Sequence, residues 1–199
     1  MAVADLTLEG LVHDLNNVFQ TIAESAELLE DDPRWEKLAH TLQRSAGRGH
    51  RIAHSILETN RSAIELAPII DNASLFCQDY LECANGPKIG FCSEIDPEFR
   101  LKGDAAGWER VFVNLFLNSA QAGAKNIRIR AHGSEIVVSD DGPGISMELL
   151  PRIFQPRVST KSIISGLGLY VVQSIVEQNG GTVKAANGLA GGAIFTLTI

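Results

Sequence analysis

Apolar residues recur every three or four positions along the first part of the chain. They fall at Leu8, Leu11, Leu15, Phe19, Ile22, Ala26 and Leu29. Because an α-helix completes a turn every 3.6 residues, this spacing places them on one stripe of an amphipathic helix. The pattern therefore predicts a long first helix over about residues 6–30.

The run Asp31-Asp32-Pro33 is predicted to end this helix and to start a second one. Asp32 is the expected N-cap, and Pro33 is the expected first helical residue, where its missing N–H costs no hydrogen bond. The second helix is predicted to reach about residue 60, with inward-facing apolar positions at Leu38, Leu42, Ala46, Ala53 and Ile56/Leu57. Two helices joined by so short a turn bury their stripes against one another, so we expect an antiparallel helical hairpin that dimerises into a four-helix bundle.

After Arg61-Ser62 the pattern changes to alternating strands and helices. The predicted strands cover about residues 64–67, 88–95, 99–102, 127–131, 135–139, 182–186 and 193–199, and the predicted helices about residues 68–84, 105–122 and 167–178, with Asp104 as the cap of the second of these helices. The expected fold class is therefore α+β. Residues 1–62 would form the helical hairpin, and residues 63–199 an α/β sandwich with one sheet covered by helices.

Composition and charge narrow the class of protein. The 199 residues are 45% apolar and 21% charged, which is typical of a globular chain and excludes disordered and fibrous proteins. The net charge of -7 argues against a broad nucleic-acid-binding surface. No apolar run approaches the roughly 18 residues of a membrane span, so we expect a cytoplasmic chain. Three cysteines without paired CxxC spacing predict reduced thiols rather than disulfides or a zinc site.

Candidate chemistry in the first helix centres on His13. This residue is two positions from both Leu11 and Leu15, about 200° around the helix, and is therefore expected to point away from the apolar stripe. Asp14 is adjacent, and Asn17 lies one turn further on the same face. An exposed imidazole with a carboxylate and an amide nearby offers a nucleophile, a base and a positioning group. A lone His-Asp pair is more often a solvated surface feature, so its meaning depends on the rest of the chain.

Two segments of the second half carry groups suited to a nucleotide. Asn114 and Asn118 are four residues apart and share one face of a predicted helix, and amide oxygens suit a Mg²⁺ ion that is otherwise held by phosphates. Asp140 follows a predicted strand and precedes Gly142 and Gly144. Its carboxylate can accept a hydrogen bond from an exocyclic amine such as that of adenine, although the run also fits a plain turn.

A third segment lies directly before the last predicted helix. Ser165-Gly166-Leu167-Gly168-Leu169 would expose backbone N–H groups at the positive end of the helix dipole, where phosphates bind. The preceding run, residues 155–164, contains Thr160 and Lys161 and is polar and basic enough to close over a triphosphate.

In this order, the motifs resemble the catalytic core of bacterial two-component sensor histidine kinases. The matching runs are Gly10-Leu-Val-His13-Asp14-Leu-Asn-Asn17 for the phosphoacceptor motif of the HDFNN subgroup, Asn114-Leu-Phe-Leu-Asn118 for the N box, Asp140-Asp-Gly142-Pro-Gly144-Ile for the first glycine box, Arg152-Ile-Phe154-Gln-Pro156 with Ser159-Thr160-Lys161 for the phenylalanine box, and Gly166-Leu-Gly168-Leu for the second glycine box. The resemblance runs from about residue 8 to the end of the chain.

The resemblance implies a Bergerat-type ATP-binding domain and a role for each matched residue. His13 would be phosphorylated by ATP, with Asp14 raising the basicity of the imidazole. Asn118 and Asn114 would hold Mg²⁺, and Asp140 would recognise the adenine amino group. The remaining nucleotide contacts would come from Gly142, Gly144, Thr160, Lys161, Gly166, Leu167, Gly168 and Leu169.

The resemblance also implies partners. The hairpin would form a homodimer, and the phosphoryl group would pass to an aspartate of a response regulator receiver domain. Asn17 also makes a phosphatase activity toward that receiver conceivable, because a polar amide on this face can orient water. The two predicted units use up the chain, so we expect the input signal to come from a region outside it or from another protein.

Two alternatives to a kinase stay open at this point. A histidine phosphotransferase or scaffold protein would carry a weak or non-catalytic nucleotide domain, whereas the nucleotide motifs here are nearly complete. A hydrolase of the wider superfamily would use a Glu where this chain has Asn114. Ile164, Arg157 and Gln121 depart from the usual kinase motifs and are expected to slow turnover.

Overall fold

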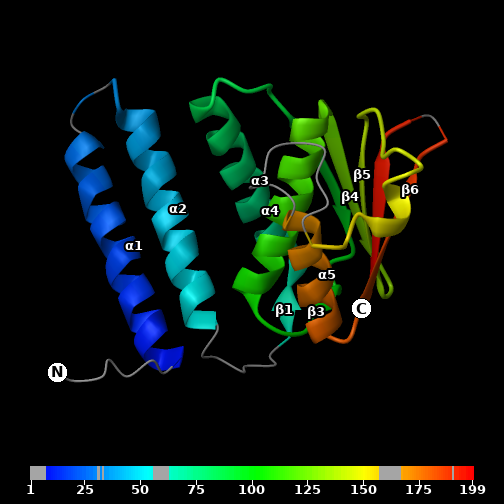
Figure 1. The fold of residues 1–199 in the computed structure, drawn as a ribbon, viewed down its shortest axis with the longest axis horizontal. Coiled ribbons are helices and arrows are strands. Elements are labelled where there is room, and N and C mark those ends of the chain that lie inside the picture. The colour runs from blue at the N-terminus through cyan, green and yellow to red at the C-terminus, as the bar shows by residue number, and fades with distance from the viewer. Residues whose placement is uncertain (1–7, 31, 33, 56–62, 157–166, 190) are drawn as a thin grey trace. The chain divides into compact units, whose positions relative to one another are not determined.

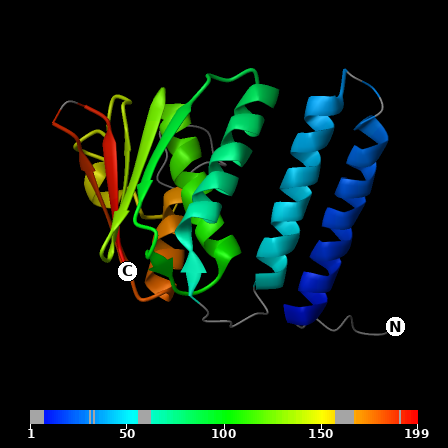
Figure 2. The same cartoon turned by 180° about the vertical axis from the view of Figure 1, so that it is seen from behind.

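The computed structural model describes residues 8–30, 32, 34–55, 63–156, 167–189 and 191–199. The chain divides into two compact units, Met1–Ser62 and Ala63–Ile199. Each unit is described by itself, and Figures 1 and 2 show them from opposite sides.

The first unit is a hairpin of two long helices, as predicted. α1 spans Leu8–Glu30 and α2 spans Glu36–Ser55, and the two lie side by side in both views (Figures 1 and 2). Alanine side chains fill most of the buried positions: Ala26 from α1, and Ala39, Ala46 and Ala53 from α2. Small residues at these positions allow the two helix backbones to approach closely.

Gly49 of α2 contributes to the same close approach. A Cβ atom at this position would lie 2.5 Å from Cζ of Phe19 on α1, which is too close for two carbon atoms. The aromatic ring of Phe19 therefore packs directly against the backbone of α2, where only glycine leaves it room.

The apolar stripe of α1 is wider than the surface that α2 covers. Val12, which was not among the predicted apolar positions, is buried, whereas Leu11 is 55% exposed. Val18 and Leu28 are also exposed. Leu11, which its spacing places on the apolar stripe, is therefore not covered within the hairpin, because α2 covers the side of α1 on which Val12 and Ala26 lie.

The second helix starts later than predicted. The carboxylate of Asp32 accepts a hydrogen bond from the backbone N–H of Arg34, and the carbonyl oxygen of Asp32 accepts one from Trp35 N–H at 2.8 Å. These bonds close a turn that precedes the helix, so Asp32 stabilises the turn and α2 begins at Glu36. Pro33, the expected first helical residue, lies outside the described residues, as do residues 56–62.

The second unit is a mixed sheet covered by helices, which confirms the α+β prediction. Its strands are β1 (Ile64–Glu65), β2 (Gly90–Ile95), β3 (Arg100–Leu101), β4 (Asn126–His132), β5 (Glu135–Asp140), β6 (Thr182–Asn187) and β7 (Ala193–Thr198), and its helices are α3 (Leu66–Cys83), α4 (Ala105–Ala122), a 3-10 turn (Leu150–Arg152) and α5 (Gly168–Gln178). The five-stranded sheet has the order β2-β4-β5-β7-β6, in which only β2 and β4 are parallel. β1 and β3 form a separate two-stranded ladder.

The first predicted strand is shorter than expected, because its second half belongs to α3. Leu66 is almost fully buried and lies in step with Ile69, Ile70 and Ala73 at helical spacing. Pro68 is the third residue of this helix, a position in the first turn where a missing backbone N–H leaves no intrahelical hydrogen bond unmade.

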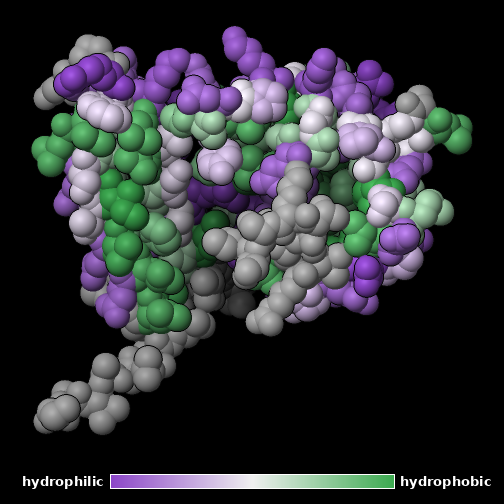
Figure 3. Space-filling view, turned by 45° about the horizontal axis from the view of Figure 1, so that its top comes forward, coloured by the Kyte–Doolittle hydropathy of each residue, from purple (hydrophilic) through white to green (hydrophobic). Residues whose placement is uncertain are grey.

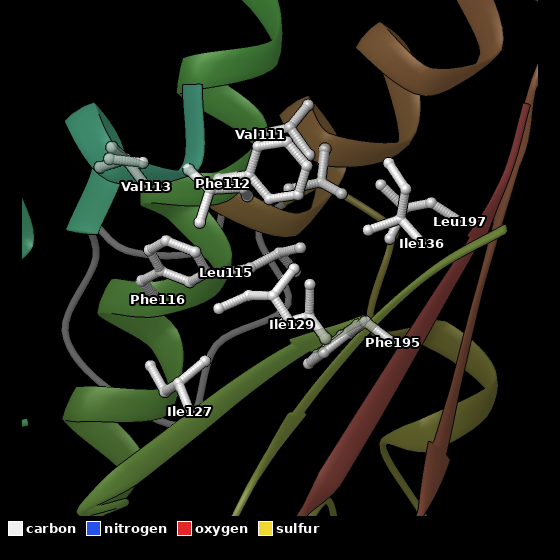
Figure 4. Packing of buried hydrophobic residues seen from close by; sticks show 14 of the residues in the cluster. Val111, Phe112, Val113, Leu115, Phe116, Ile127, Ile129, Ile136, Phe195 and Leu197 are labelled. Carbon is white, nitrogen blue, oxygen red and sulfur yellow. The ribbon is translucent and has the colours of Figure 1, made fainter. Parts of the chain in front are cut away.

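The core of the second unit lies between α4 and the sheet. Ile127, Ile129 and Ala131 alternate with exposed residues along β4, so one face of the sheet is apolar. Phe112 and Phe116 of α4 point toward this face (Figure 4), and α3, α4 and α5 cover it (Figure 1). The packed core holds α4 firmly, and α4 in turn positions the polar residues described below.

Within the described residues, none of the helices is long and apolar enough to cross a lipid bilayer.

Candidate functional site

The carboxylate of Asp140, at the end of β5, accepts three hydrogen bonds in the candidate site. Its Oδ2 accepts a hydrogen bond from the hydroxyl of Ser119 at 2.7 Å. Its Oδ1 accepts one from the backbone N–H of Gly142 at 2.9 Å and one from Ala193 N–H at 3.1 Å. These contacts tie the end of β5 to α4 and to the start of β7, and they fix the orientation of the carboxylate.

Asp141, the next residue, fastens the opposite side of the same loop. Its Oδ1 accepts hydrogen bonds from the backbone N–H groups of Lys125 at 2.7 Å and Asn126 at 2.9 Å, and its Oδ2 accepts one from the side chain of Asn126 at 2.7 Å. The Asn126 backbone and side chain, followed by the Lys125 backbone, lower the pKa of Asp141 to about 2. Asp141 is therefore a structural acceptor, and this leaves Asp140 as the residue that faces α4.

The glycines that follow Asp140 allow the chain to turn tightly. Gly144 has a φ of 79°, in the left-handed region that favours glycine. A Cβ atom at this residue would lie 2.7 Å from Oδ1 of Asn187. Asn187 itself binds both backbone polar atoms of Ile145, each at 2.7 Å.

Asn114, Asn118 and Gly168 meet between α4 and α5. The Nδ2 of Asn114 donates to the carbonyl oxygen of Arg110 at 2.8 Å, so its Oδ1 points away from that turn of the helix. A Cβ atom on Gly168 would lie 3.1 Å from Oδ1 of Asn114 and 3.7 Å from Nδ2 of Asn118. The two amides that the sequence placed on one helix face therefore lie beside the start of α5.

The Nδ2 of Asn118 is enclosed and has no hydrogen-bond partner among the described residues. An enclosed polar group without a partner costs free energy, on the order of 1–3 kcal/mol. The start of α5 is also uncapped within the described chain, because Leu167 provides no side-chain hydrogen bond. Unbonded donors at a helix N-terminus suit an anion such as a phosphate.

Several predicted site residues lie outside the described part of the chain. They are Thr160, Lys161 and Gly166, together with the departures Arg157 and Ile164. His13 lies within α1, although its side chain is not described, so its predicted direction stays a prediction. Asp14 and Asn17, one and four residues further along α1, are exposed.

Three residues that hold the site together were not predicted from the sequence: Ser119, Asp141 and Asn187. Ser119 is a buried hydroxyl next to Asn118 on an otherwise apolar face, and this pattern is a usable signal. The partners of Asp141 and Asn187 lie 15 and 42 residues away, respectively, so no local pattern indicates them.

The described residues contain no group of three or more His, Cys, Asp and Glu side chains that would bind a metal ion on its own. Cys77, Cys83 and Cys92 are free thiols, and burial raises the pKa of Cys77 to about 11. A metal ion at this site would therefore depend on amide oxygens and on a bound nucleotide.

Comparisons with known proteins show which proteins this chain is similar to. Residues 103–199 match the family model described as histidine kinase-, DNA gyrase B-, and HSP90-like ATPase. The sensor histidine kinase ZraS of Klebsiella oxytoca is 32% identical over 206 residues, which cover 94% of this chain and 44% of ZraS. The sensor protein FixL of Bradyrhizobium diazoefficiens is 28% identical over 215 residues, which cover 96% of this chain and 42% of FixL. The chain thus spans less than half the length of these curated relatives.

Solved structures show the same architecture. The nucleotide-free catalytic domain of histidine kinase ThkA matches with a TM-score of 0.59 and 27% identity, over 70% of this chain and 95% of that one. Full-length ShkA in complex with AMPPNP matches with a TM-score of 0.60 and 18% identity, over 98% of this chain and 45% of that one. At this identity the match indicates a shared fold and nothing about function. The chain is therefore a homologue of the sensor histidine kinases, and its C-terminal part is an ATP-binding domain of the family that also includes DNA gyrase B and HSP90.

Proposed function

We propose that this chain is an ATP-dependent protein histidine kinase that phosphorylates its own His13 and passes the phosphoryl group to an aspartate of a response regulator receiver domain. The observation that carries the proposal is the pairing of two amides, Asn114 and Asn118, with the uncapped start of α5. The same chain carries a histidine, His13, on α1, and 94% of its length aligns with the sensor histidine kinase ZraS.

In this proposal each part of the nucleotide meets a different element. Asp140 accepts the hydrogen bond of the adenine amine. The backbone N–H groups of Gly168 and Leu169, at the start of α5, bind phosphate oxygens. Gly142 and Gly144 bring the backbone close to the nucleotide. Thr160, Lys161 and Gly166, with Leu167, would complete the contacts with the nucleotide.

The amides at the α4–α5 boundary fit a magnesium ion that accompanies the nucleotide. Asn114 directs its Oδ1 toward Gly168, and half a turn of the Asn118 amide would put an oxygen where its unpartnered Nδ2 lies. Hard, neutral oxygen ligands suit Mg²⁺, which retains water and phosphate as its other ligands. When bound, the ion would neutralise charge that develops on the phosphates during transfer.

The proposed reaction is an in-line phosphoryl transfer. A ring nitrogen of His13 attacks the γ-phosphorus, a P–N bond forms, and the bond to the β,γ-bridging oxygen breaks, so that ADP leaves. Asp14 hydrogen-bonds the imidazole and raises its basicity. For this transfer the γ-phosphate held by the second unit and the imidazole of His13 on the hairpin must come into contact.

A homodimer through the hairpin belongs to the same proposal. Leu11, Val18 and Leu28 leave apolar surface on α1 uncovered by α2, and Figure 3 shows hydrophobic side chains gathered along the hairpin helices. A second hairpin would bury this surface and complete a four-helix bundle.

Three other functions are weaker candidates. A histidine relay or scaffold protein would not need an Asp140 whose carboxylate is fixed by three hydrogen bonds. A hydrolase would need a base to activate water, and the neutral amide of Asn114 cannot remove a proton. A phosphatase activity toward the receiver, with Asn17 orienting water, rests on the exposure of Asn17 alone.

The test is autophosphorylation of the purified chain with γ-labelled ATP and Mg²⁺. The proposal expects acid-labile, base-stable label on the wild type and none on His13→Ala, while both bind ATP equally. His132→Ala, an exposed histidine on β4, is the matched control and should label normally. Label that persists in His13→Ala would show that another residue is the acceptor, and a wild type that binds ATP without labelling would favour the relay.

A further inference from the structure

Asn187, at the end of β6, makes a closed pair of hydrogen bonds with one residue of the nucleotide loop. Its Oδ1 accepts from the backbone N–H of Ile145, and its Nδ2 donates to the carbonyl oxygen of the same residue, both at 2.7 Å. The two residues are 42 positions apart in the sequence. One side chain thus binds both the backbone N–H and the backbone C=O of a single residue, as a paired residue on a neighbouring β-strand would.

The contact extends to Gly144. Because a Cβ atom at this residue would lie 2.7 Å from Oδ1 of Asn187, the amide fits closely against the glycine. The left-handed φ of Gly144 and the clamp on Ile145 hold adjacent parts of one turn. Asn187 therefore stabilises the particular conformation in which this turn passes the nucleotide site.

The β6–β7 hairpin also holds the other end of the loop. The backbone N–H of Ala193 donates to Oδ1 of Asp140. A Cβ atom on the preceding residue, Gly192, would collide with the carbonyl oxygen of Asp140. The segment from Asp140 to Ile145 is thus attached to the same hairpin at both of its ends, once through a backbone N–H and once through the side chain of Asn187.

We propose that Asn187 is a positioning residue for nucleobase recognition: it holds the loop of residues 140–145 in the conformation that receives adenine. This inference rests on the proposed role of Asp140 and goes beyond it, since Asn187 lies outside every motif discussed above. Without the clamp, the loop keeps its anchors at Asp140 and Asp141 but loses the one at Ile145, so binding of the base must also order that end of the loop. The phosphate site at the start of α5 does not depend on this clamp.

The experiment compares ATP with inosine triphosphate, which has a carbonyl where adenine has its amine. Calorimetric titration of the full chain gives the Kd of each nucleotide for the wild type and Asn187→Ala. Loss of two hydrogen bonds at an exposed position is expected to raise the Kd for ATP by about three- to tenfold. The Kd for inosine triphosphate should stay within about twofold of the wild-type value. The ratio of the Kd for inosine triphosphate to the Kd for ATP therefore decreases in the variant.

Two further variants separate positioning from general damage. Asn187→Asp keeps the acceptor for Ile145 N–H but faces the Ile145 carbonyl oxygen with a second oxygen, so it should also weaken ATP binding selectively. Asn72→Ala, an exposed asparagine on α3, should change neither Kd. Thermal unfolding without nucleotide checks that each variant is folded.

Equal losses for ATP and inosine triphosphate, or no loss for either, would overturn the positioning role. Such a result would leave the kinase proposal intact, because the wild type would still bind ATP and label His13. Failure of the wild type to bind ATP would overturn both proposals. Failure of labelling alone would affect the kinase proposal without touching the role of Asn187.

Discussion

The hydroxyl of Ser119 donates to Oδ2 of Asp140 at 2.7 Å, and it links the last turn of α4 to the end of β5. Two backbone N–H groups, from Gly142 and Ala193, occupy Oδ1 of the same carboxylate. A carboxylate offers about four acceptor positions, so one remains, and it lies on Oδ2. A carboxylate held in this way accepts one more N–H donor and repels a carbonyl oxygen, and this is the discrimination that an adenine site requires.

We predict that Asp140→Asn weakens ATP binding about ten- to hundredfold, the range expected when a hydrogen bond to a charged group is lost. An asparagine has one acceptor oxygen and one NH₂ group, so it cannot accept from Ser119, from both backbone N–H groups and from the ligand together. Calorimetric titration with ATP measures the effect.

Asp71→Asn is the matched control for this substitution, because Asp71 is an exposed carboxylate on α3. It removes the same charge and should leave the Kd for ATP at the wild-type value. An Asp140→Asn variant with unchanged affinity would remove Asp140 from the adenine site.

Local sequence determines much of this fold because the relevant interactions are local. α4 begins and ends where its pattern predicts: Asp104 accepts hydrogen bonds from the N–H groups of Ala106 and Gly107, and Gly123 ends the helix with a φ of 92°. Each of these contacts joins residues within one helical turn. The spacing of Asn114 and Asn118 likewise places both amides on one face of the helix without any tertiary contact.

Long-range partners account for what the sequence did not reveal. Ser119 and Asp140 are 21 residues apart, and Asn187 and Ile145 are 42 residues apart, so each pair meets only when the sheet forms. Burial of Val12 rather than Leu11 has a similar origin. Both lie near the apolar side of one helix, and the direction from which α2 approaches decides which of them is covered.

Asp141 makes the stability of the second unit depend on pH in the acid range. Its pKa is lowered to about 2 in the folded protein, chiefly by the backbone and side chain of Asn126, against about 3.9 for an unfolded aspartate. A lowered pKa means that the unfolded chain binds the proton more readily. The stabilisation of the folded second unit by the ionised Asp141 carboxylate is therefore complete above about pH 4 and is lost as the pH falls through about 2.

We predict that Asp141→Asn lowers the Tm of the full chain at pH 7 and that the difference from wild type narrows between about pH 4 and pH 2. The amide would face two backbone N–H groups with at most one acceptor oxygen, so Lys125 or Asn126 loses a partner. Thermal unfolding followed by circular dichroism across this range measures the difference. A Tm difference that stays constant down to pH 2 would contradict the stated role of the ionised carboxylate.

The contact between Gly49 and Phe19 makes a prediction for the helical hairpin. A Cβ atom at residue 49 would overlap the ring of Phe19, and overpacking of this kind typically costs about 1–3 kcal/mol. Alanine has a better helix propensity than glycine, and this offsets up to about 1 kcal/mol of the overpacking cost. Gly49→Ala should therefore lower the free energy of unfolding, as measured by thermal denaturation of the full chain.

Gly47→Ala is the matched control two residues away on the same helix. A Cβ atom there meets only the guanidinium of Arg51 at 3.8 Å, so the substitution gains helix propensity without a clash and should raise the Tm. In the double variant Phe19→Leu/Gly49→Ala, the smaller leucine side chain leaves room for the new methyl group. This variant should therefore recover part of the stability that Gly49→Ala loses. If Gly49→Ala instead raised the Tm as Gly47→Ala does, the two helices would not be in contact at Phe19, and the surface available for a second hairpin would have to be assigned anew.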